Sequence, residues 1–366
     1  MNKKAIFHIP FAINEDWPSA SQIRPQKMIE AFRDIGYDLK IVMGKAADRK
    51  KTINEIKKEI KMGKKYEFLY SESSTMPTLL TEWHHLPLHP FLDFSLFKLC
   101  KKNKIPVGLF YRDIYWMFDQ YKKDVSLLKR MISILFYRYD LKKYRKFVNI
   151  LFFPSNKMFK YIKNYPISRM YELPPGVIKD KFFYKKIKKN NIKLLYVGGI
   201  GGLYDISKIL IAVSTMKNIK LYVCTRKMEW EVYKHKYRNY LCNVEIFHIS
   251  GKELDNLYKK SDIALACFDE VEYRNFAMPM KLFEYLSYGK PIIASKNTAV
   301  GDFVKKYKIG WCIPYKENSI KKVLENILSK PTLITNYRNN SKKIIVDNTW
   351  ISRAERVSQV LTSKLK

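Results

Sequence analysis

Residues 278–295 read M-P-M-K-L-F-E-Y-L-S-Y-G-K-P-I-I-A-S, the pattern of a short helix followed by a buried strand. Pro279 suits the first helical position because its missing N–H costs nothing there, and Gly289 stands where helices commonly end in a left-handed residue. The helix is therefore expected to be about ten residues long. The apolar run 291–294 fits a strand covered on both faces. This stretch indicates an α/β fold with a parallel sheet.

Lys281 and Glu284 are three residues apart, so they share one face of this helix, which we expect to point outward with a charge pair. The unpaired N–H groups at the helix start, with Lys281 in the first turn, suit a phosphate or diphosphate. Glu284, one turn deeper, is placed to accept the two hydroxyls of a ribose, at roughly 1.5–3 kcal/mol for each hydrogen bond to a charged acceptor. The alternative is an ordinary surface Lys–Glu pair.

The sequence Pro-x-Lys-x-x-Glu, followed by Gly-Lys-Pro and an apolar strand, resembles the sugar-nucleotide site of GT-B-fold glycosyltransferases, especially the family 4 or "group 1" type. The resemblance implies that Glu284 holds the ribose of the nucleotide. It also implies that Lys281, with the helix start at Pro279, faces the diphosphate. Many retaining members carry a second glutamate eight residues earlier, where this chain has Phe276, so the stereochemistry of the transfer stays open.

The same resemblance implies a GT-B architecture of two Rossmann-like, doubly wound domains facing a cleft, with a C-terminal helix crossing back to the first domain. At 366 residues the chain is long enough for two hydrophobic cores. We expect an N-terminal acceptor-binding domain over residues 1–178, a Lys-rich linker over 179–191, a nucleotide-sugar domain over 192–345 and the returning helix over 346–366.

Two further parts of the second domain are candidates for the donor site, because ligands bind at the carboxyl ends of strands in open α/β sheets. Gly199 and Gly201 follow the predicted strand 192–197, where a turn without side chains lets phosphate approach the backbone N–H groups. Arg226 follows the predicted strand 220–224 and is a second candidate for neutralising the diphosphate.

Two loops complete the predicted donor site. In similar proteins the loop that begins after Ile249 touches the nucleotide base through its backbone. The polar loop 269–277 leads into the helix with Glu284, so it is expected to border the donor sugar, with Asn275 as a candidate contact. No Asp-x-Asp pair that would hold a divalent cation is present. We therefore expect no metal and no cofactor, with a nucleotide-diphosphate sugar, UDP-linked in the first instance, as the donor.

Asp113 is the candidate catalytic residue. It follows the buried strand predicted over residues 105–110, with Tyr115 and Trp116 close behind it. A carboxylate among aromatic rings that exclude water and stack on sugars suits a general base for an acceptor hydroxyl. The alternatives are that Asp113 pairs with Arg112 or caps the next helix.

A long helix is predicted over residues 124–147, where basic residues, among them Arg130 and Arg138, alternate with aliphatic and aromatic ones. With a formal net charge of +35, this helix could lie in the interface of an anionic membrane. The alternative is an ordinary core helix with a solvated basic face. The chain has no apolar run long enough to span a bilayer, and its five scattered cysteines indicate a reducing compartment. We expect a cytoplasmic protein bound peripherally to the inner face of the cell membrane.

Together these features predict a metal-independent, hexosyltransferase-like enzyme of cell-surface polysaccharide assembly. Its partners would be a nucleotide sugar, a glycan or lipid-linked acceptor and an anionic membrane, and no nucleic acid. A sugar-nucleotide epimerase of the same fold is the alternative within enzymes. A basic nucleic-acid-binding protein is the alternative of another class, although the sequence has no recognised nucleic-acid motif.

Overall fold

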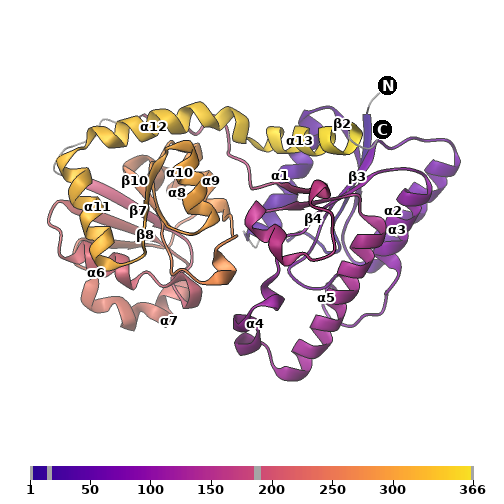
Figure 1. Ribbon diagram of the computed structural model, residues 1–366, viewed down its shortest axis with the longest axis horizontal. Helices are drawn as coiled ribbons and strands as arrows, with labels where there is room; N and C mark the ends of the chain where they lie inside the picture. The colour runs from indigo at the N-terminus through magenta and orange to yellow at the C-terminus, as the bar shows by residue number, and fades with distance from the viewer. Residues whose placement is uncertain (1–2, 15–18, 185–190, 364–366) are drawn as a thin grey trace. The chain divides into compact units, whose positions relative to one another are not determined.

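A computed structural model describes residues 3–14, 19–184 and 191–363. It divides the chain into two compact units (Figure 1): unit 1 comprises Met1–Pro175 with Trp350–Lys366, and unit 2 comprises Gly176–Thr349. Val177 forms a bridge with Thr349, so the segments that enter and leave unit 2 are paired. Residues 185–190 of the predicted linker lie outside the described residues.

Unit 1 is built on a sheet of six parallel strands in the order β2-β1-β3-β4-β5-β6. The central strands are apolar and buried on both faces, as parallel strands covered by helices must be. The strands are β1 (Lys3–His8), β2 (Tyr37–Val42), β3 (Phe68–Glu72), β4 (Val107–Phe110), β5 (Ile150–Phe153) and β6 (Met170–Glu172).

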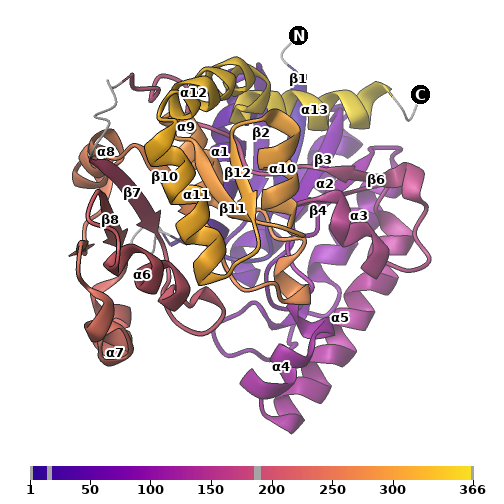
Figure 2. The ribbon, with the colours of Figure 1, turned by 60° about the vertical axis from the view of Figure 1, so that its left-hand side comes forward.

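The helices of unit 1 include the C-terminal helix, α13, which packs against α1 and against β3 and β4. The helices are α1 (Ala20–Asp34), α2 (Ala46–Lys61), α3 (Leu92–Lys102), α4 (Asp119–Asp124), α5 (Leu127–Phe147) and α13 (Trp350–Ser363). Short 3₁₀ turns are η1 (Thr78–Leu80), η2 (Tyr115–Met117), η3 (Asn156–Tyr161) and η4 (Ile167–Arg169). Figures 1 and 2 show α4 and the first half of α5 extending beyond the sheet of this unit.

Unit 2 repeats the architecture with a second parallel sheet of six strands in the order β12-β11-β10-β7-β8-β9 (Figure 2). The strands are β7 (Ile192–Val197), β8 (Ile219–Cys224), β9 (Val244–Phe247), β10 (Ile263–Ala266), β11 (Ile292–Ser295) and β12 (Gly310–Ile313). Hydrophobic clusters cover both faces of this sheet. The two sheets confirm the predicted pair of Rossmann-like units.

The helices of unit 2 follow their strands by short connections. They are α6 (Ser207–Ser214), α7 (Lys227–Tyr237), α8 (Gly251–Lys260), α9 (Met280–Ser287), α10 (Ala299–Tyr307), α11 (Glu317–Ser329) and α12 (Thr332–Ile345). The 3₁₀ turns are η5 (Gly202–Tyr204), η6 (Arg238–Tyr240), η7 (Glu272–Arg274) and η8 (Val346–Asn348).

Helix α9 and strand β11 occupy the stretch from which the fold was predicted. Pro279 precedes the helix as its N-cap, and Gly289 follows it in the left-handed region at φ +63°. A side chain at Gly289 would also collide with the ring of Phe182, whose nearest carbon lies 2.3 Å from the position of a Cβ. The helix has eight residues, shorter than the predicted ten, because Pro279 stands outside it and Tyr288 already leaves it.

Each sheet has one point where the strand order reverses. In unit 1, β2 and β3 lie on opposite sides of β1, and in unit 2, β8 and β10 lie on opposite sides of β7. The loops that leave the two strands at such a point diverge and open a crevice at the carboxyl ends of the strands, where open α/β sheets bind ligands. We call these places the switch point of unit 1, between β1 and β3, and the switch point of unit 2, between β7 and β10.

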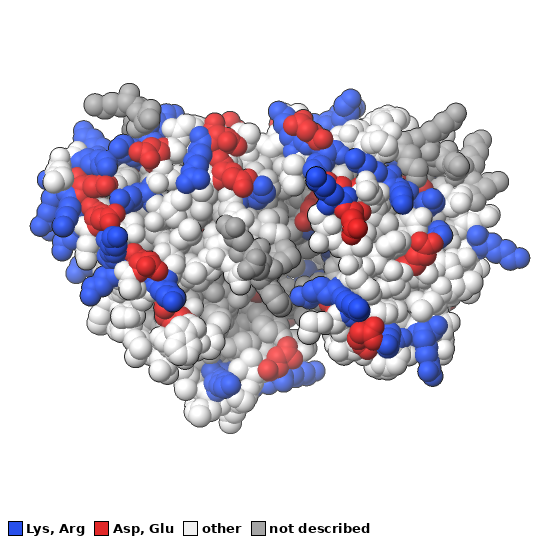
Figure 3. Space-filling model, turned by 180° about the vertical axis from the view of Figure 1, so that it is seen from behind, with Lys and Arg blue, Asp and Glu red and all other residues white. Residues whose placement is uncertain are grey.

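Lys and Arg are spread over the surface between Asp and Glu on the face seen in Figure 3. Within the described residues, no helix combines the length and the apolar composition needed to cross a membrane.

Candidate functional site

Lys281, in the first turn of α9, lies at the switch point of unit 2. Its Nζ lies 4.3 Å from the ring centroid of Tyr196 on β7 and 5.0 Å from that of Phe268, just beyond β10. A side chain at Gly198, whose φ is +135°, would come within 3.2 Å of this Nζ. Helix α9 therefore holds the lysine between the two strands at which the order reverses.

The predicted outward-facing Lys–Glu pair is wrong. Lys281 is 9% exposed, and its Nζ has no hydrogen-bond partner in the described structure. Most of this short helix is buried, so the face that carries Lys281 packs against the sheet. Burial, and next the charge of Arg274, lower the pKa of Lys281 to about 7. A protonated Lys281 therefore has no ion-pair partner among the described residues, which is unfavourable unless an anion binds.

Glu284 is half-buried one turn along α9. Its Oε2 accepts a hydrogen bond from Tyr258 Oη at 2.8 Å. Tyr258 is itself stacked on Tyr288 with ring centroids 4.4 Å apart, so the carboxylate is held in one orientation. Burial raises the pKa of Glu284. The second carboxylate oxygen remains available to accept hydrogen bonds from a ligand.

Unsatisfied polar atoms gather at the carboxyl edge of the unit 2 sheet. In the described part of this unit, buried atoms without a hydrogen-bond partner include Thr225 Oγ1, Arg274 Nε, Asn275 Oδ1 and Lys281 Nζ. Thr225 follows β8, and the other three belong to the segment between β10 and the first turn of α9. Folded proteins rarely leave buried polar atoms unpaired, so several at one edge indicate a ligand site.

The glycine turn after β7 already holds an anion from the chain itself. Glu229 on α7 accepts hydrogen bonds through Oε1 from Ile200 N at 2.8 Å and Gly201 N at 3.2 Å. A Cβ at Gly199 would lie 2.9 Å from that Oε1, and one at Gly201 would lie 2.0 Å from the ring of Tyr233. These glycines thus make room for α7, and phosphate could reach the turn only by displacing Glu229.

Three other predicted donor residues lie at the same edge with different surroundings. Arg226 is the N-cap of α7, is largely exposed and pairs with Glu229 at 3.2 Å. The Ile249 carbonyl accepts a hydrogen bond from Cys224 Sγ at 3.4 Å, which ties the loop before α8 to β8. The Asn275 carbonyl accepts a hydrogen bond from Ala299 N at 2.7 Å, and this bond fixes the loop before α9.

The predicted catalytic residue, Asp113, follows β4 in unit 1. Its Oδ1 accepts a hydrogen bond from Tyr115 N at 3.0 Å, although Ile114, and not Asp113, is the N-cap of η2. Tyr115 Oη donates to Asp124. Trp116 Nε1 donates to Tyr111 Oη at 3.2 Å, and its ring stacks on Tyr137 with centroids 5.0 Å apart. The two aromatic residues therefore pack α4 and α5 next to the segment that carries Asp113.

Helix α5 carries an exposed apolar surface together with basic residues. Arg138 is exposed, and Arg130 is half-buried and donates to the carbonyl of Lys122 at 3.1 Å. Exposed apolar side chains on this helix are Leu127, Leu128, Met131, Ile132 and Leu135. The loop before α3 adds Trp83, Leu86, Leu88 and Phe91, and it is tied to α5 by the bond from Tyr139 Oη to the Pro90 carbonyl. We call these nine residues the apolar surface of unit 1.

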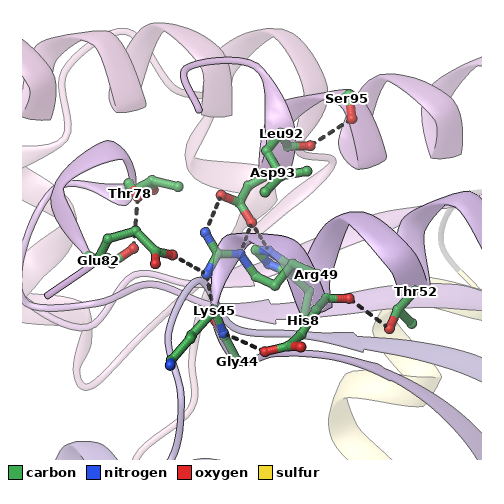
Figure 4. A network of polar contacts seen from close by, with 12 residues as sticks. His8, Gly44, Lys45, Arg49, Thr52, Thr78, Glu82, Leu92, Asp93 and Ser95 are labelled. Atoms are coloured by element: carbon green, nitrogen blue, oxygen red, sulfur yellow. Dashed lines mark hydrogen bonds and ion pairs between the residues drawn. The ribbon is translucent and has the colours of Figure 1, made fainter. Parts of the chain in front are cut away.

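The switch point of unit 1 contains a polar network that the sequence did not reveal (Figure 4). His8 at the end of β1 bonds Ser71 Oγ at 2.8 Å and Asp93 Oδ1 at 2.9 Å. Arg49 Nε donates to Asp93 at 2.9 Å, and its Nη1 donates to Glu82 at 3.0 Å. Burial would raise the pKa of Asp93, but the hydrogen bond from His8 and the charges of His8 and Arg49 hold it below its ordinary value.

The sequence reading missed two charged residues of the unit 2 site. Arg274 lies one position before Asn275 in the loop 269–277. Its burial, which the sequence does not show, is what distinguishes it from the arginines on the surface. Glu229 lies on α7, 29 positions beyond Ile200, so its bond to the glycine turn could not be read from local sequence.

Comparisons with known proteins agree with this architecture. Residues 177–344 match the family model described as "Glycosyl transferases group 1", in agreement with the resemblance noted in the sequence. No match was found among curated protein sequences.

Solved structures of glycosyltransferases match the whole chain. WaaG, a glycosyltransferase involved in lipopolysaccharide biosynthesis, is 15% identical with a TM-score of 0.60, covering 98% of this chain and 100% of that one. A glycosyltransferase from Rickettsia africae is 12% identical with a TM-score of 0.68, covering 99% and 100%. HepE from Anabaena, in complex with UDP-glucose, is 9% identical with a TM-score of 0.64, covering 98% and 99%. These likenesses confirm the predicted GT-B fold.

Proposed function

We propose that the protein is a glycosyltransferase that moves a sugar, a hexose in the first instance, from a nucleotide-diphosphate donor to a glycan or lipid-linked acceptor of cell-surface polysaccharide assembly. The observation that carries the proposal is the set of unsatisfied polar atoms around Lys281 at the switch point of unit 2. The match of residues 177–344 to the glycosyltransferase family model and the HepE complex with UDP-glucose support it.

The donor site is built on α9 and the loop before it. Lys281 Nζ, which has no partner in the described structure, and the start of α9 at Pro279, which carries the positive end of the helix dipole, face the diphosphate. Glu284, held by Tyr258, accepts the ribose hydroxyls. Asn275 Oδ1, buried without a partner, is available to a hydroxyl of the sugar, and the loop that begins after Ile249 would contact the base. Arg226 stands at the rim, where it can attract the anionic donor.

The chemistry follows from this charge distribution. As the bond to the sugar breaks, the leaving nucleoside diphosphate gains negative charge, and fixed cations aimed at it lower the barrier. Lys281 supplies such charge from the protein, so we propose that transfer needs no metal. Asp113 takes the proton of the attacking hydroxyl if the enzyme inverts. Phe276, which occupies the position of the second family glutamate, is 2% exposed and packs on Tyr273, so it offers no carboxylate for retention.

Thermal unfolding with UDP, GDP, ADP and CMP and their sugars tests the donor site. A nucleotide at about 100 times its Kd stabilises the protein by roughly 2.7 kcal/mol. We expect a UDP compound to do so, Glu284→Ala to lose the response, and Glu253→Ala, an exposed glutamate of unit 2, to keep it. If no nucleotide stabilises the folded wild type, the proposal fails.

Asp113→Asn tests the base. The asparagine side chain keeps an oxygen for Tyr115 N but cannot take a proton, so turnover should fall by roughly 10²–10⁴-fold while the affinity for UDP stays unchanged. Asp119→Asn, an exposed aspartate of α4, is the control. Turnover within threefold of the wild type would remove Asp113 from the mechanism. Conversion of the donor without any acceptor would instead indicate the epimerase.

We further propose that the apolar surface of unit 1 docks on the inner face of the cell membrane, where a lipid-linked acceptor would be presented. Leu128 is 71% and Phe91 70% exposed, an uncommon position for large apolar side chains, and Arg138 lies on the same helix for anionic headgroups. Co-sedimentation with anionic vesicles should be lost in Leu128→Glu with Leu135→Glu. It should persist in Met228→Glu, which alters a side chain 84% exposed in unit 2. Equal sedimentation of both variants would contradict membrane docking.

A further inference from the structure

Arg274 is a second buried cation at the switch point of unit 2. It ends the 3₁₀ turn η7 and is 5% exposed. Its guanidinium lies 4.0 Å from the ring centroid of Tyr204 and 4.2 Å from that of Phe268. Its Nη1 donates to the carbonyl of Leu203 at 3.2 Å, and its Nε is buried without a hydrogen-bond partner.

Arg274 and Lys281 share the same aromatic rings. Lys281 Nζ lies 5.0 Å from the ring centroid of Phe268 and 5.8 Å from that of Tyr204. The rings attract cations through their faces but bring no negative charge. Arg274 and Lys281 are therefore buried near the same rings, where the charge of Arg274 disfavours the protonated form of Lys281.

The charges of Glu284 and Glu229 favour protonated Lys281, but neither carboxylate forms an ion pair with Lys281 or Arg274 in the described structure. Glu284, on the same helix as Lys281, is engaged with Tyr258, and Glu229 on α7 is engaged with the glycine turn and Arg226. The remaining ionisable neighbours are the thiol of Cys267, whose pKa burial raises above its ordinary range, and the phenols of Tyr196 and Tyr204. Burial also raises the pKa of the Tyr196 phenol, so neither that phenol nor the thiol brings negative charge near pH 7.

We propose that Arg274 and Lys281 together form a two-cation site for the diphosphate of the nucleotide donor, and that binding of the nucleotide is coupled to uptake of a proton by Lys281. This inference rests on the proposed function. A nucleoside diphosphate carries more than one negative charge, spread over two phosphorus atoms, and so matches two cations presented by a loop and a helix start. It offsets the repulsion between them and favours the protonated lysine, whose pKa is lowered to about 7 while the site holds no anion.

Isothermal titration calorimetry with UDP at pH 8, in HEPES and in Tris, measures both parts of the proposal. The two buffers have different ionisation enthalpies, so the difference in observed heat gives the number of protons exchanged. Because the pKa of Lys281 is lowered to about 7, part of the free protein carries a neutral lysine at pH 8, and we expect net uptake of protons when UDP binds. We also expect the affinity to weaken steadily from pH 7 to pH 9.

Variants of Arg274 separate charge from structure. Arg274→Gln should weaken UDP binding at least tenfold. It should also reduce the proton uptake at pH 8, because Lys281 without its charged neighbour is already protonated to a larger extent. Arg274→Lys, which keeps the charge, should retain most of the affinity and the uptake. Arg238→Gln, at an exposed arginine of unit 2, is the control and should match the wild type.

The role of Arg274 and the uptake of a proton by Lys281 are tested separately. An affinity of Arg274→Gln within threefold of the wild type would overturn the role of Arg274. Heats that do not depend on the buffer, with UDP bound, would overturn the proton coupling, and this result needs no variant. In both cases the donor site itself would stand. If the folded wild type binds no nucleotide diphosphate, the proposed function and this inference fall together.

Discussion

Among the described residues at the switch point of unit 1, the network of His8, Arg49 and Asp93 is internally paired, although Nη1 and Nη2 of nearby Arg24 are buried without a partner, whereas Lys281 at the switch point of unit 2 has no polar partner at all. In unit 1, Arg49 faces Asp93 and Glu82, and His8 joins Asp93 to Ser71 (Figure 4). The space left beside them is about 10 Å³, room for about one water molecule. In unit 2, Lys281 has aromatic rings around it and no acceptor in the described structure.

The charged side chains at the two switch points thus have different roles. A buried network of opposite charges contributes mainly to stability. Removing one member leaves the others buried and unpaired, which lowers the free energy of unfolding. A cluster of cations without an anion is unfavourable in the free protein and becomes favourable when an anion binds. The comparison predicts that the first crevice contributes stability and the second contributes affinity.

Arg49→Met should have the largest effect on stability. It leaves Asp93 and Glu82 without their cation in a site where Arg49 is 2% exposed, and the free energy of unfolding should fall by about 3–5 kcal/mol. Urea denaturation measures this loss. A decrease of less than 1 kcal/mol would show that the network is not the structural element that the comparison requires.

Lys281→Met should behave in the opposite way. No hydrogen bond is lost within the described residues, so the free energy of unfolding at pH 7 should not decrease. The affinity for UDP should weaken by roughly 1.5–3 kcal/mol, the value of a charge-assisted hydrogen bond. Urea denaturation and calorimetry on one preparation give both numbers, with Lys259→Met, at an exposed lysine of α8, as the control. A destabilised variant that still binds UDP would reverse the roles assigned to the two crevices.

Asp140 on α5 is a buried carboxyl group of unit 1 that is only partly hydrogen-bonded, and its effect on stability depends on pH. Thr78 N donates to its Oδ2 at 2.7 Å, its Oδ1 is buried without a partner, and burial raises its pKa to about 7. Because the folded state binds the proton more tightly than the unfolded chain, the stabilising contribution is complete below about pH 4. It is lost as the pH rises to 7.

Asp140→Asn should remove that dependence and raise the stability at pH 8 by roughly 1–3 kcal/mol. Unfolding curves at pH 5 and pH 8 for both proteins measure the difference between them. If Asp140→Asn changes the free energy of unfolding by the same amount at both pH values, the pKa of Asp140 is not raised in the folded state.

Glu229→Gln should have the smallest effect and sharpens the account of unit 2. The amide oxygen of glutamine can accept the same bonds from Ile200 N and Gly201 N, so the affinity for UDP should change by less than threefold, or about 0.6 kcal/mol. Calorimetry with UDP measures it. A tenfold gain in affinity would mean that phosphate competes with Glu229 for the glycine turn, and the turn would then join the donor site.

The sequence was informative where the structure depends on local pattern. The turn at Gly289 and the strand after it follow from backbone chemistry that a few neighbouring residues determine, and the fold prediction depended on them. The positions of Lys281 and Glu284 one turn apart on α9 also follow from local geometry.

Contacts between distant segments could not be predicted in the same way. Lys281 is buried because Tyr196 on β7 and Phe268, just beyond β10, lie close to it, whereas helical periodicity alone placed it on the outside. The Ser71–His8–Asp93 network joins positions 63 and 85 residues apart, and Arg274 gains its surroundings from Tyr204 on another loop. Such contacts depend on the order of the strands, which local sequence does not encode.

A crystal structure of the protein with UDP bound is the most direct test of the central claim, that the unpaired cations of unit 2 form the donor site. The account predicts a phosphate oxygen within hydrogen-bond distance of Lys281 Nζ and the ribose hydroxyls on Glu284. It also predicts that Glu229 remains on the glycine turn. A diphosphate bound at the glycine turn in place of Glu229, or anywhere that leaves Lys281 without a partner, would contradict it.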